Sequence, residues 1–177
     1  DNKSKYNVLV ISQEQRASWI RNFNPLTPGG SARWPTSSGI YEPLMIYNSM
    51  KGKYIPWLST NYLWNQNNDT LSIFIRENVE WSDGKSFTAH DVLYTFNLLK
   101  KYPAFDARGL WSYLKDVVVI NNYELKFIFS SIFVPGFESI IGQVIVPEHI
   151  WSTIEDPIKF SNPNPIGTGP FTEIVTF

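Results

Sequence analysis

Apolar and polar positions divide the chain into short elements of both kinds. The β-branched run at 6–12 predicts a buried strand, and the alternating run at 71–77 predicts a second one. Two apolar runs within 116–130 flank Asn121-Asn122, which predicts a β-hairpin that turns at these two residues. The chain therefore contains strands that pair locally.

The stretch 79–96, VEWSDGKSFTAHDVLYTF, carries a turn followed by the start of a helix. Asp83-Gly84 is a strong turn signal. Thr88 is placed as the N-cap, and Asp91 three residues later completes a capping box with Asp in place of the usual Glu or Gln. We therefore interpret these acids as turn and cap residues.

The positions after this cap have helical spacing. Val92, Phe96 and Leu99 lie on one face of a helix that we expect to end near Lys101. His90 falls in the first turn of this helix, where we expect it to be exposed. The segment thus predicts an amphipathic helix packed on a core.

The remaining segments are shorter or irregular. Pro and Gly interrupt 23–39 and predict a long loop, and the apolar segment 40–48 predicts a short helix. The segments 134–142 and 146–154 carry an early Pro, which suits the first turn of a helix. A Pro/Gly loop at 161–177 leads into a final strand. Strands and short helices without a regular βαβ alternation predict an α+β fold.

Composition narrows the possible functions. The chain has 177 residues, 43% of them hydrophobic and 18% charged, which is typical of a globular protein. Its net charge of -1 and its scattered basic residues give no reason to expect nucleic-acid binding. There are no cysteines, which excludes disulfides and thiolate chemistry. The 7 Trp, 9 Tyr and 12 Phe suit both a core and ligand-stacking surfaces.

No pattern in the sequence points to catalysis. A glycosidase needs two carboxylates that face one sugar, and the available acids are explained by turns, caps or surface positions. His90 and His149 both lie at expected helix starts without ligand-spaced partners, so we expect no metal site. A Gly-x-Ser-x-Gly elbow and a phosphate-binding loop are both absent from the sequence. We therefore predict that the protein is not an enzyme and needs no cofactor.

Three motifs stand out in the sequence. The first is a V-x-W-x-D-G-x-x-F-x-A-x-D-V-x-[FY] run preceded by a strand that ends in Ile-Arg. The second is NPIGTGPFTEI at 164–174, similar to P-[IV]-G-T-G-P-[FY], and the third is SGIYEPLM at 38–45. The residues that match the first motif are Ile75, Arg76, Val79, Trp81, Asp83, Gly84, Phe87, Ala89, Asp91, Val92 and Tyr94. In this order the three motifs resemble a known family, the bacterial extracellular solute-binding proteins of family 5.

The resemblance implies a fold and an organisation. It implies a periplasmic-binding-protein-like lobe fragment of α+β class, with a mixed sheet and an appended helix and hairpin subdomain. Family members are longer and have two lobes. The resemblance therefore implies a first-lobe strand and loop at 1–34, an extra subdomain at 35–163, and a return strand to the first lobe at 164–177. The second lobe would be absent.

The resemblance also implies a function. It implies the exported substrate-binding component of an ABC importer, a monomer, periplasmic or anchored outside the membrane, with ABC permease subunits as partners. We expect noncovalent capture of an oligosaccharide, cello- or another β-linked type, with an oligopeptide as the alternative ligand. A glycosidase or a sugar-binding module is the alternative from another class.

The candidate ligand contacts lie in the first loop and at two later tryptophans. We expect the glycines to let the backbone approach a ligand, Arg33 to donate hydrogen bonds to hydroxyls or a carboxylate, and Trp34 to stack on a sugar face. A surface loop with Trp34 packed on its own lobe is the alternative interpretation. Core packing is the alternative for the two later tryptophans. The candidate residues are Gly29, Gly30, Ser31, Arg33, Trp34, Trp64 and Trp111.

Overall fold

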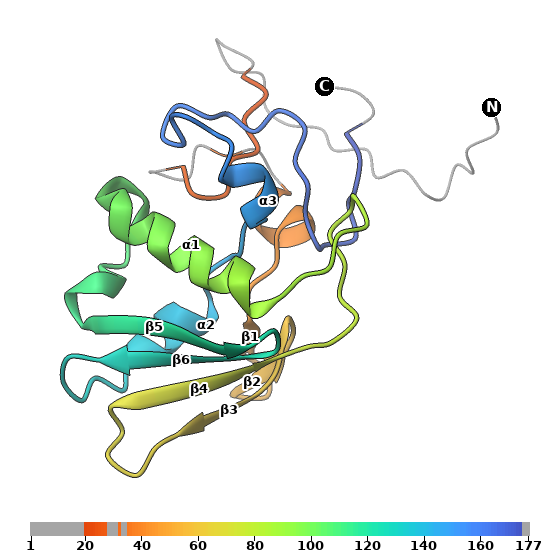
Figure 1. The fold of residues 1–177 in the computed structure, drawn as a ribbon. Helices are drawn as coiled ribbons and strands as arrows, with labels where there is room; N and C mark the ends of the chain where they lie inside the picture. Colours follow the sequence, from red (N-terminus) through yellow and green to blue (C-terminus); the bar gives the residue numbers. More distant parts are fainter. Residues whose placement is uncertain (1–19, 28–31, 33–34, 175–177) are drawn as a thin grey trace.

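The computed structural model describes residues 20–27, 32 and 35–174. In this part of the chain, a four-stranded sheet in the order β3-β4-β6-β5 lies beside a two-stranded sheet, β1-β2 (Figure 1). The elements are η2 Thr36–Ile40, β1 Met45–Asn48, β2 Lys53–Pro56, β3 Ser59–Trp64, β4 Thr70–Ile75, α1 Ala89–Lys101, η3 Pro103–Phe105, η4 Leu110–Ser112, β5 Leu114–Asn121, β6 Glu124–Phe129, α2 Gly136–Ile141 and α3 Glu148–Trp151.

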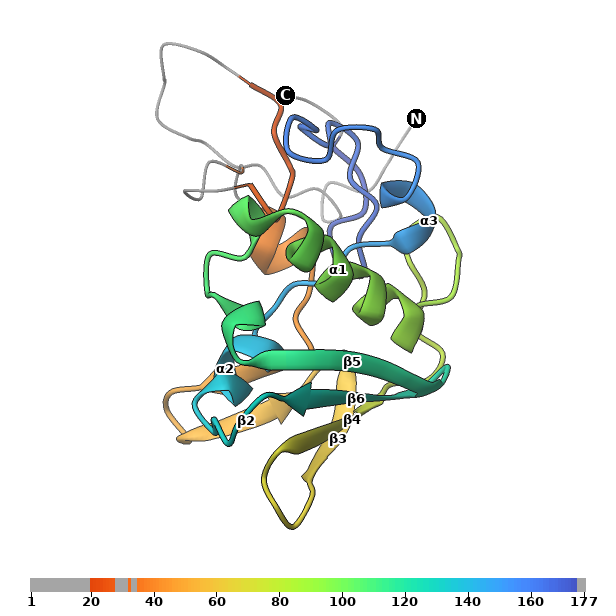
Figure 2. The ribbon, with the colours of Figure 1, turned by 60° about the vertical axis from the view of Figure 1, so that its left-hand side comes forward.

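This arrangement confirms the predicted α+β class with an appended helix and hairpin unit. All strand pairs among the described residues are antiparallel, so the parallel pairs of the predicted mixed sheet are not among them. Figures 1 and 2 show α1 lying along one face of the larger sheet, with α3 on the side of α1 away from that sheet.

The central strands β4 and β6 alternate between buried and partly exposed residues. Their register places Leu71 opposite Phe127 and Ile73 opposite Leu125, and all four side chains are buried. Alternation brings these apolar residues to the face that α1 covers, because side chains in a strand have a period of two. The strand predicted at 71–77 is thus confirmed as β4.

Helix α1 begins as the sequence predicts. The Thr88 side chain accepts a hydrogen bond from the helix's first turn, and the Asp91 side chain accepts from the Thr88 amide, which forms a capping box. The predicted apolar stripe is buried, and its Phe96 ring meets the Phe127 ring edge to face with centroids 4.7 Å apart. The helix ends at Lys101, as predicted.

The predicted hairpin is present as β5 and β6, but its loop lies one residue later than expected. Asn121 still pairs within the ladder, and the loop consists of Asn122 and Tyr123. The carbonyls of these two residues accept hydrogen bonds from the amides of Ala89 and Ile75, each at 2.8 Å. The turn is therefore held against the start of α1 and the end of β4.

The short helix predicted at 40–48 is wrong. Residues Met45–Asn48 instead form strand β1, which pairs with β2 through a turn that contains Gly52 at φ 59°. Pro43 disfavours helical geometry in the residue before it and has no amide to donate. A short apolar run does not distinguish helix from strand by itself.

The helices predicted at 134–142 and 146–154 are confirmed as α2 and α3, but their prolines lie one position earlier than predicted. Pro135 and Pro147 are the N-cap residues rather than residues of the first turn. At an N-cap the missing proline amide removes no hydrogen bond within the helix, because the first amides of a helix have no partner in it.

Three predictions concern irregular or terminal segments. In the described residues of the loop at 23–39, a turn lies at 25–26 and the π-helical η2 begins at Thr36 and ends at Ile40. Residues 161–174 form no strand, and the remaining residues 175–177 lie outside the described part of the chain, as does the strand predicted at 6–12. Within the described ranges, no helix is long and apolar enough to cross a membrane.

Candidate functional site

The predicted ligand-contacting loop falls mostly outside the described residues. Gly29, Gly30, Ser31, Arg33 and Trp34 all belong to the undescribed part, so their role stays a prediction. The structure does describe the residues on both sides of this loop. It therefore shows how the two ends of the loop are held.

The second family-like motif holds the C-terminal end of this loop. The Gly169 amide donates to the Ile40 carbonyl at 2.9 Å, and the Phe171 amide donates to the Gly39 carbonyl at 3.0 Å. A Cβ atom at Gly167 would lie 2.0 Å from the Ile40 carbonyl oxygen, and one at Gly169 would lie 2.3 Å from that of Gly39. Two backbone segments can approach this closely only because the motif has no side chains at these positions.

The same motif contacts the first motif. The Ser82 amide donates to the Gly167 carbonyl at 2.9 Å. Ser82 belongs to the Trp-Ser-Asp-Gly turn that precedes α1, and Gly39-Ile40 belongs to the third motif. All three stretches that carry the family resemblance therefore meet at one place in the fold.

Two buried asparagines hold the other end of the loop. Asn162 donates from Nδ2 to the Tyr41 hydroxyl at 2.6 Å and to the Phe23 carbonyl at 3.1 Å. Asn24 donates to the Phe160 carbonyl at 2.7 Å and accepts from the Leu26 amide at 2.8 Å. Both asparagines are buried. Because the hydrogen bonds of buried polar groups are costly to lose, this end of the loop has a fixed position.

The turn before α1 is also tied to α3. The Nε2 atom of His149 lies 2.7 Å from Oδ2 of Asp83, and the Asp91 Oδ1 atom accepts from the Glu148 amide at 3.0 Å. The Lys85 amide donates to Asp83 and the Thr88 amide donates to Asp91, which confirms that these acids serve the turn and the cap, and His90 is exposed as predicted. The contact between His149 and Asp83 was not predicted, because 66 residues separate the partners.

The contact between Asp83 and His149 predicts a pH dependence of stability. Burial raises the pKa of Asp83, but hydrogen bonds from the His149 side chain and the Lys85 amide outweigh it and lower this pKa below its ordinary value. The fold therefore favours the carboxylate, so the contribution is complete above about pH 4 and is lost as the pH falls through the lowered pKa. Asp83→Asn should lower the free energy of unfolding by about 0.2–1 kcal/mol near pH 6. Urea denaturation at pH 6 and below pH 3 measures this difference.

The matched control is Asp156→Asn, because Asp156 pairs with Lys159 on an open surface at 3.0 Å. This control should change stability less than Asp83→Asn at either pH. If Asp83→Asn destabilises the protein equally at both pH values, the carboxylate is not the source of the effect.

The two later candidate tryptophans lie in different parts of the fold. Trp64 in β3 is half-buried, with its ring 5.2 Å from that of Phe129 and 6.4 Å from that of Phe137. Trp111 in η4 donates from Nε1 to the Phe96 carbonyl at 2.8 Å, and Lys100 Nζ lies 4.2 Å from the centre of its ring. The structure gives both rings packing contacts and does not bring them together.

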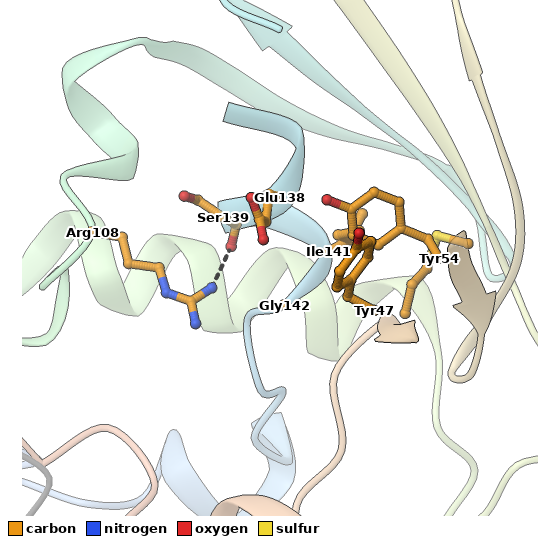
Figure 3. Close-up of a pocket in the computed structure, with 8 residues that line it drawn as sticks. Tyr47, Tyr54, Arg108, Glu138, Ser139, Ile141 and Gly142 are labelled. Carbon is orange, nitrogen blue, oxygen red and sulfur yellow. Dashed lines mark hydrogen bonds between the residues drawn. The ribbon is translucent and has the colours of Figure 1, made fainter. Parts of the chain in front are cut away.

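A pocket that the sequence did not predict opens between the β1-β2 hairpin, α2 and the loop before η4 (Figure 3). Its volume is about 360 Å³. Tyrosines of the hairpin form one side, and a cation, an anion and a hydroxyl group lie on the other. The lining residues are Met45, Tyr47, Tyr54, Arg108, Glu138, Ser139, Ile141 and Gly142.

This pocket has one sequence signal that was available. Tyr47 and Tyr54 flank the segment NSMKGK, whose Gly52 suits a hairpin turn. A hairpin pairs them, and the structure does place Tyr47 opposite Tyr54. Because a helix was predicted at 40–48, this strand pairing was not predicted from the sequence. Arg108 and Glu138 come from distant segments, and the sequence holds no signal that places them beside the hairpin.

The described residues contain no group of three or more His, Asp or Glu that could hold a metal ion. The one His–Asp contact described above has no Ser or Thr hydroxyl hydrogen-bonded to its histidine among the described residues. What the arrangement can do chemically is to bind a molecule through aromatic faces and hydrogen bonds.

Known proteins resemble this chain in sequence and in fold. A putative ABC transporter peptide-binding protein of Brucella abortus is 27% identical over 160 residues, which are 85% of this chain and 29% of that protein. The nickel-binding periplasmic protein of Escherichia coli is 26% identical over 168 residues, 89% of this chain and 31% of that protein. The chain therefore spans less than a third of the length of these relatives.

A solved structure, that of a periplasmic oligopeptide-binding protein of an ABC transporter from Thermotoga maritima, is 34% identical with a TM-score of 0.78. The similarity covers 85% of this chain and 28% of that one, and the same protein has been solved with mannohexaose bound. Residues 53–173 match the family model described as bacterial extracellular solute-binding proteins, family 5 Middle. Since this match covers more than half of the sequence, the chain belongs to the bacterial extracellular solute-binding proteins of family 5.

Proposed function

We propose that this chain is part of the substrate-binding component of an ABC importer and captures an oligosaccharide outside the cytoplasmic membrane. The observation that carries the proposal is the similarity to the Thermotoga maritima protein, which is 34% identical and has been solved with mannohexaose bound. Capture would be noncovalent, through stacking and hydrogen bonds, and ABC permease subunits would receive the solute.

An oligopeptide is the second candidate ligand. The Brucella and Thermotoga relatives are named as peptide-binding and oligopeptide-binding proteins. A peptide would bind through its backbone, as an added strand, and would need charged partners for its ends. The tryptophan beside Arg33 in the first loop favours a sugar, because Trp offers a flat apolar face and Arg offers several donors. The relatives are binding proteins, which argues against a glycosidase.

The proposed organisation places the ligand near the first loop. Residues 1–34 and 164–177 would belong to one lobe, and 35–163 would form the extra subdomain. The Arg21 guanidinium donates to the Asn164 side chain at 3.3 Å and to the Ile174 carbonyl at 3.4 Å, and these contacts between the two segments support this organisation. A second lobe would then close over the ligand, as in other two-lobed binding proteins.

The proposal predicts ligand-dependent stabilisation. Mannohexaose or cellohexaose at a hundredfold excess over Kd should stabilise the protein by about 2.7 kcal/mol, because a ligand that binds only the folded state shifts the unfolding equilibrium. A thermal-shift and Trp-fluorescence titration measures this effect. The test uses the 177-residue chain, and a pool of tri- to pentapeptides is titrated in parallel.

Two variants locate the effect. Trp34→Ala should abolish the sugar-induced shift, whereas Trp57→Ala, a partly exposed tryptophan outside the loop, should retain it. A shift with peptides alone would replace the sugar by the peptide alternative. Slow hydrolysis of the sugar would contradict a purely binding function.

A further inference from the structure

The pocket beside the β1-β2 hairpin has an aromatic wall that is already in place. The Tyr47 and Tyr54 rings lie 5.0 Å apart, and the Tyr54 ring meets Phe137 of α2 edge to face at 5.2 Å. Phe137 in turn lies 4.5 Å from Tyr62 of the larger sheet. Tyr47 ends this series of rings and is 51% exposed. A ring held in this way loses little freedom when a ligand stacks on it.

The opposite wall carries polar groups of both kinds. Arg108 donates from Nη1 to the Ser139 carbonyl at 3.2 Å, and its guanidinium lies over Gly142, where a Cβ would come within 3.0 Å of Nη1 (Figure 3). Glu138 precedes Ser139 on the same helix. In the described part of the chain neither Arg108 nor Glu138 has an ion-pair partner. The wall therefore presents free donors and free acceptors.

Glu138 lines the same pocket as the two hairpin tyrosines. Burial, and after it the charge of Glu138, raises the pKa of Tyr54. Figure 3 shows Glu138 across the pocket from Tyr47 and Tyr54, and its side chain is exposed. A molecule that rests on Tyr47 would have an acceptor and a cation within its surroundings.

We propose that this pocket binds a pyranose unit of a saccharide. The C–H face of the ring would lie on Tyr47, and its hydroxyls would donate to Glu138 and accept from Arg108. A pyranose needs a flat apolar surface together with donors and acceptors, and this pocket supplies all three. Its volume of about 360 Å³ lies at the small end of the range for ligand pockets, which suits one or two sugar units.

A zwitterion such as an amino acid also matches a cation and an anion. Arg108 and Glu138 are both exposed, however, and ion pairs open to solvent contribute little binding free energy. Stacking on Tyr47 does not depend on those charges, which favours the neutral sugar. The inference goes beyond the proposed function, because this pocket shares no residue with the first loop.

The two methionines of the chain provide a direct test. Met45 lines the pocket, whereas Met50 is 97% exposed at the tip of the same hairpin and does not line it. In the 177-residue chain labelled with ¹³C at the methionine methyl groups, cellohexaose or mannohexaose should shift the Met45 signal saturably and leave Met50 unmoved. A Met50→Leu variant assigns the two signals.

Variants separate the pocket from the rest of the surface. Tyr47→Ala should raise the Kd read from Met45 about tenfold, and Glu138→Gln should raise it several-fold. Both side chains are exposed, so neither change should prevent folding. The matched control is Tyr123→Ala, a tyrosine of similar chemistry in the β5-β6 turn that should leave the Met45 titration unchanged.

Three results would overturn the proposal: a Met45 signal that does not move, equal shifts of both methionines, or a Kd that Tyr47→Ala leaves unchanged. A Met45 shift with phenylalanine or a dipeptide and none with the sugars would assign the pocket to a zwitterion instead. Sugar binding that is lost in Trp34→Ala while Met45 stays unmoved would support the proposed function and reject the pocket. A saturable Met45 shift together with sugar binding that Trp34→Ala leaves unchanged would support the pocket and reject the role of the first loop in the proposed function.

Discussion

Gly167→Ala is expected to lower the free energy of unfolding by at least about 3 kcal/mol, a large part of the total stability of a typical domain. A Cβ atom at this position would lie 2.0 Å from the Ile40 carbonyl oxygen and 2.7 Å from the Ile40 carbonyl carbon. Both are backbone atoms, so no side chain can rotate away. The two segments must separate, which breaks the bond from the Gly169 amide to the Ile40 carbonyl at 2.9 Å.

Urea denaturation followed by Trp fluorescence measures this loss, and Gly52→Ala is the matched control. Gly52 has φ 59° and nothing within 4 Å of its added Cβ, so its substitution costs only the left-handed backbone conformation. That cost is about 1 kcal/mol. If Gly167→Ala is no more destabilising than Gly52→Ala, the close approach of the two backbones does not hold the loop.

Local signals in the sequence were sufficient where neighbouring residues decide the structure. Thr88 and Asp91 cap α1 because both partners lie within one turn of the chain, and the apolar spacing of the helix fixes its buried face. The alternation in β4 likewise needed no distant information. In these segments the cap, the propensity and the burial pattern all favour the same element.

The sequence was less informative where two distant segments decide the structure. Residues 40–48 follow no decisive period, and their strand exists because Met45–Asn48 pairs with β2 and because Pro43 bridges to Val144. The pocket could not be predicted for the same reason. Arg108 reaches it only because its guanidinium lies over Gly142 and donates to Ser139, more than thirty residues away.

The motifs illustrate the same distinction. The Gly-Thr-Gly-Pro stretch identified a family, but its physical role emerged only when Gly167 and Gly169 were placed against the Gly39-Ile40 backbone. The motif needs glycine at both positions because a side chain at either one would collide with backbone. The Gly39-Ile40 segment that it contacts has no such sequence requirement for these bonds, because every residue supplies a backbone carbonyl.

The second large effect is expected for Asp91→Ala, which should lower the free energy of unfolding by about 3 kcal/mol. Asp91 is 5% exposed and accepts two hydrogen bonds from backbone amides, from Thr88 to Oδ2 at 2.9 Å and from Glu148 to Oδ1 at 3.0 Å. Removal of the carboxylate leaves both partly buried amides without this partner, and an unsatisfied group costs about 1–3 kcal/mol when it is buried. The change therefore weakens the start of α1 and its link to α3 together.

Thr88→Ala separates these two contributions. It removes only the side chain that accepts from the His90 amide at 3.2 Å, so it should cost about 1 kcal/mol. Hydrogen exchange then identifies the link: the Glu148 amide should lose protection in Asp91→Ala and keep it in Thr88→Ala. Asp91→Asn retains one acceptor oxygen, so its stability should lie between that of Asp91→Ala and that of Thr88→Ala. Equal exchange of Glu148 in all the variants would mean that Asp91 acts only as a cap and that α3 is held by other contacts, such as the bond from the Val146 amide to Thr95 Oγ1 at 3.1 Å.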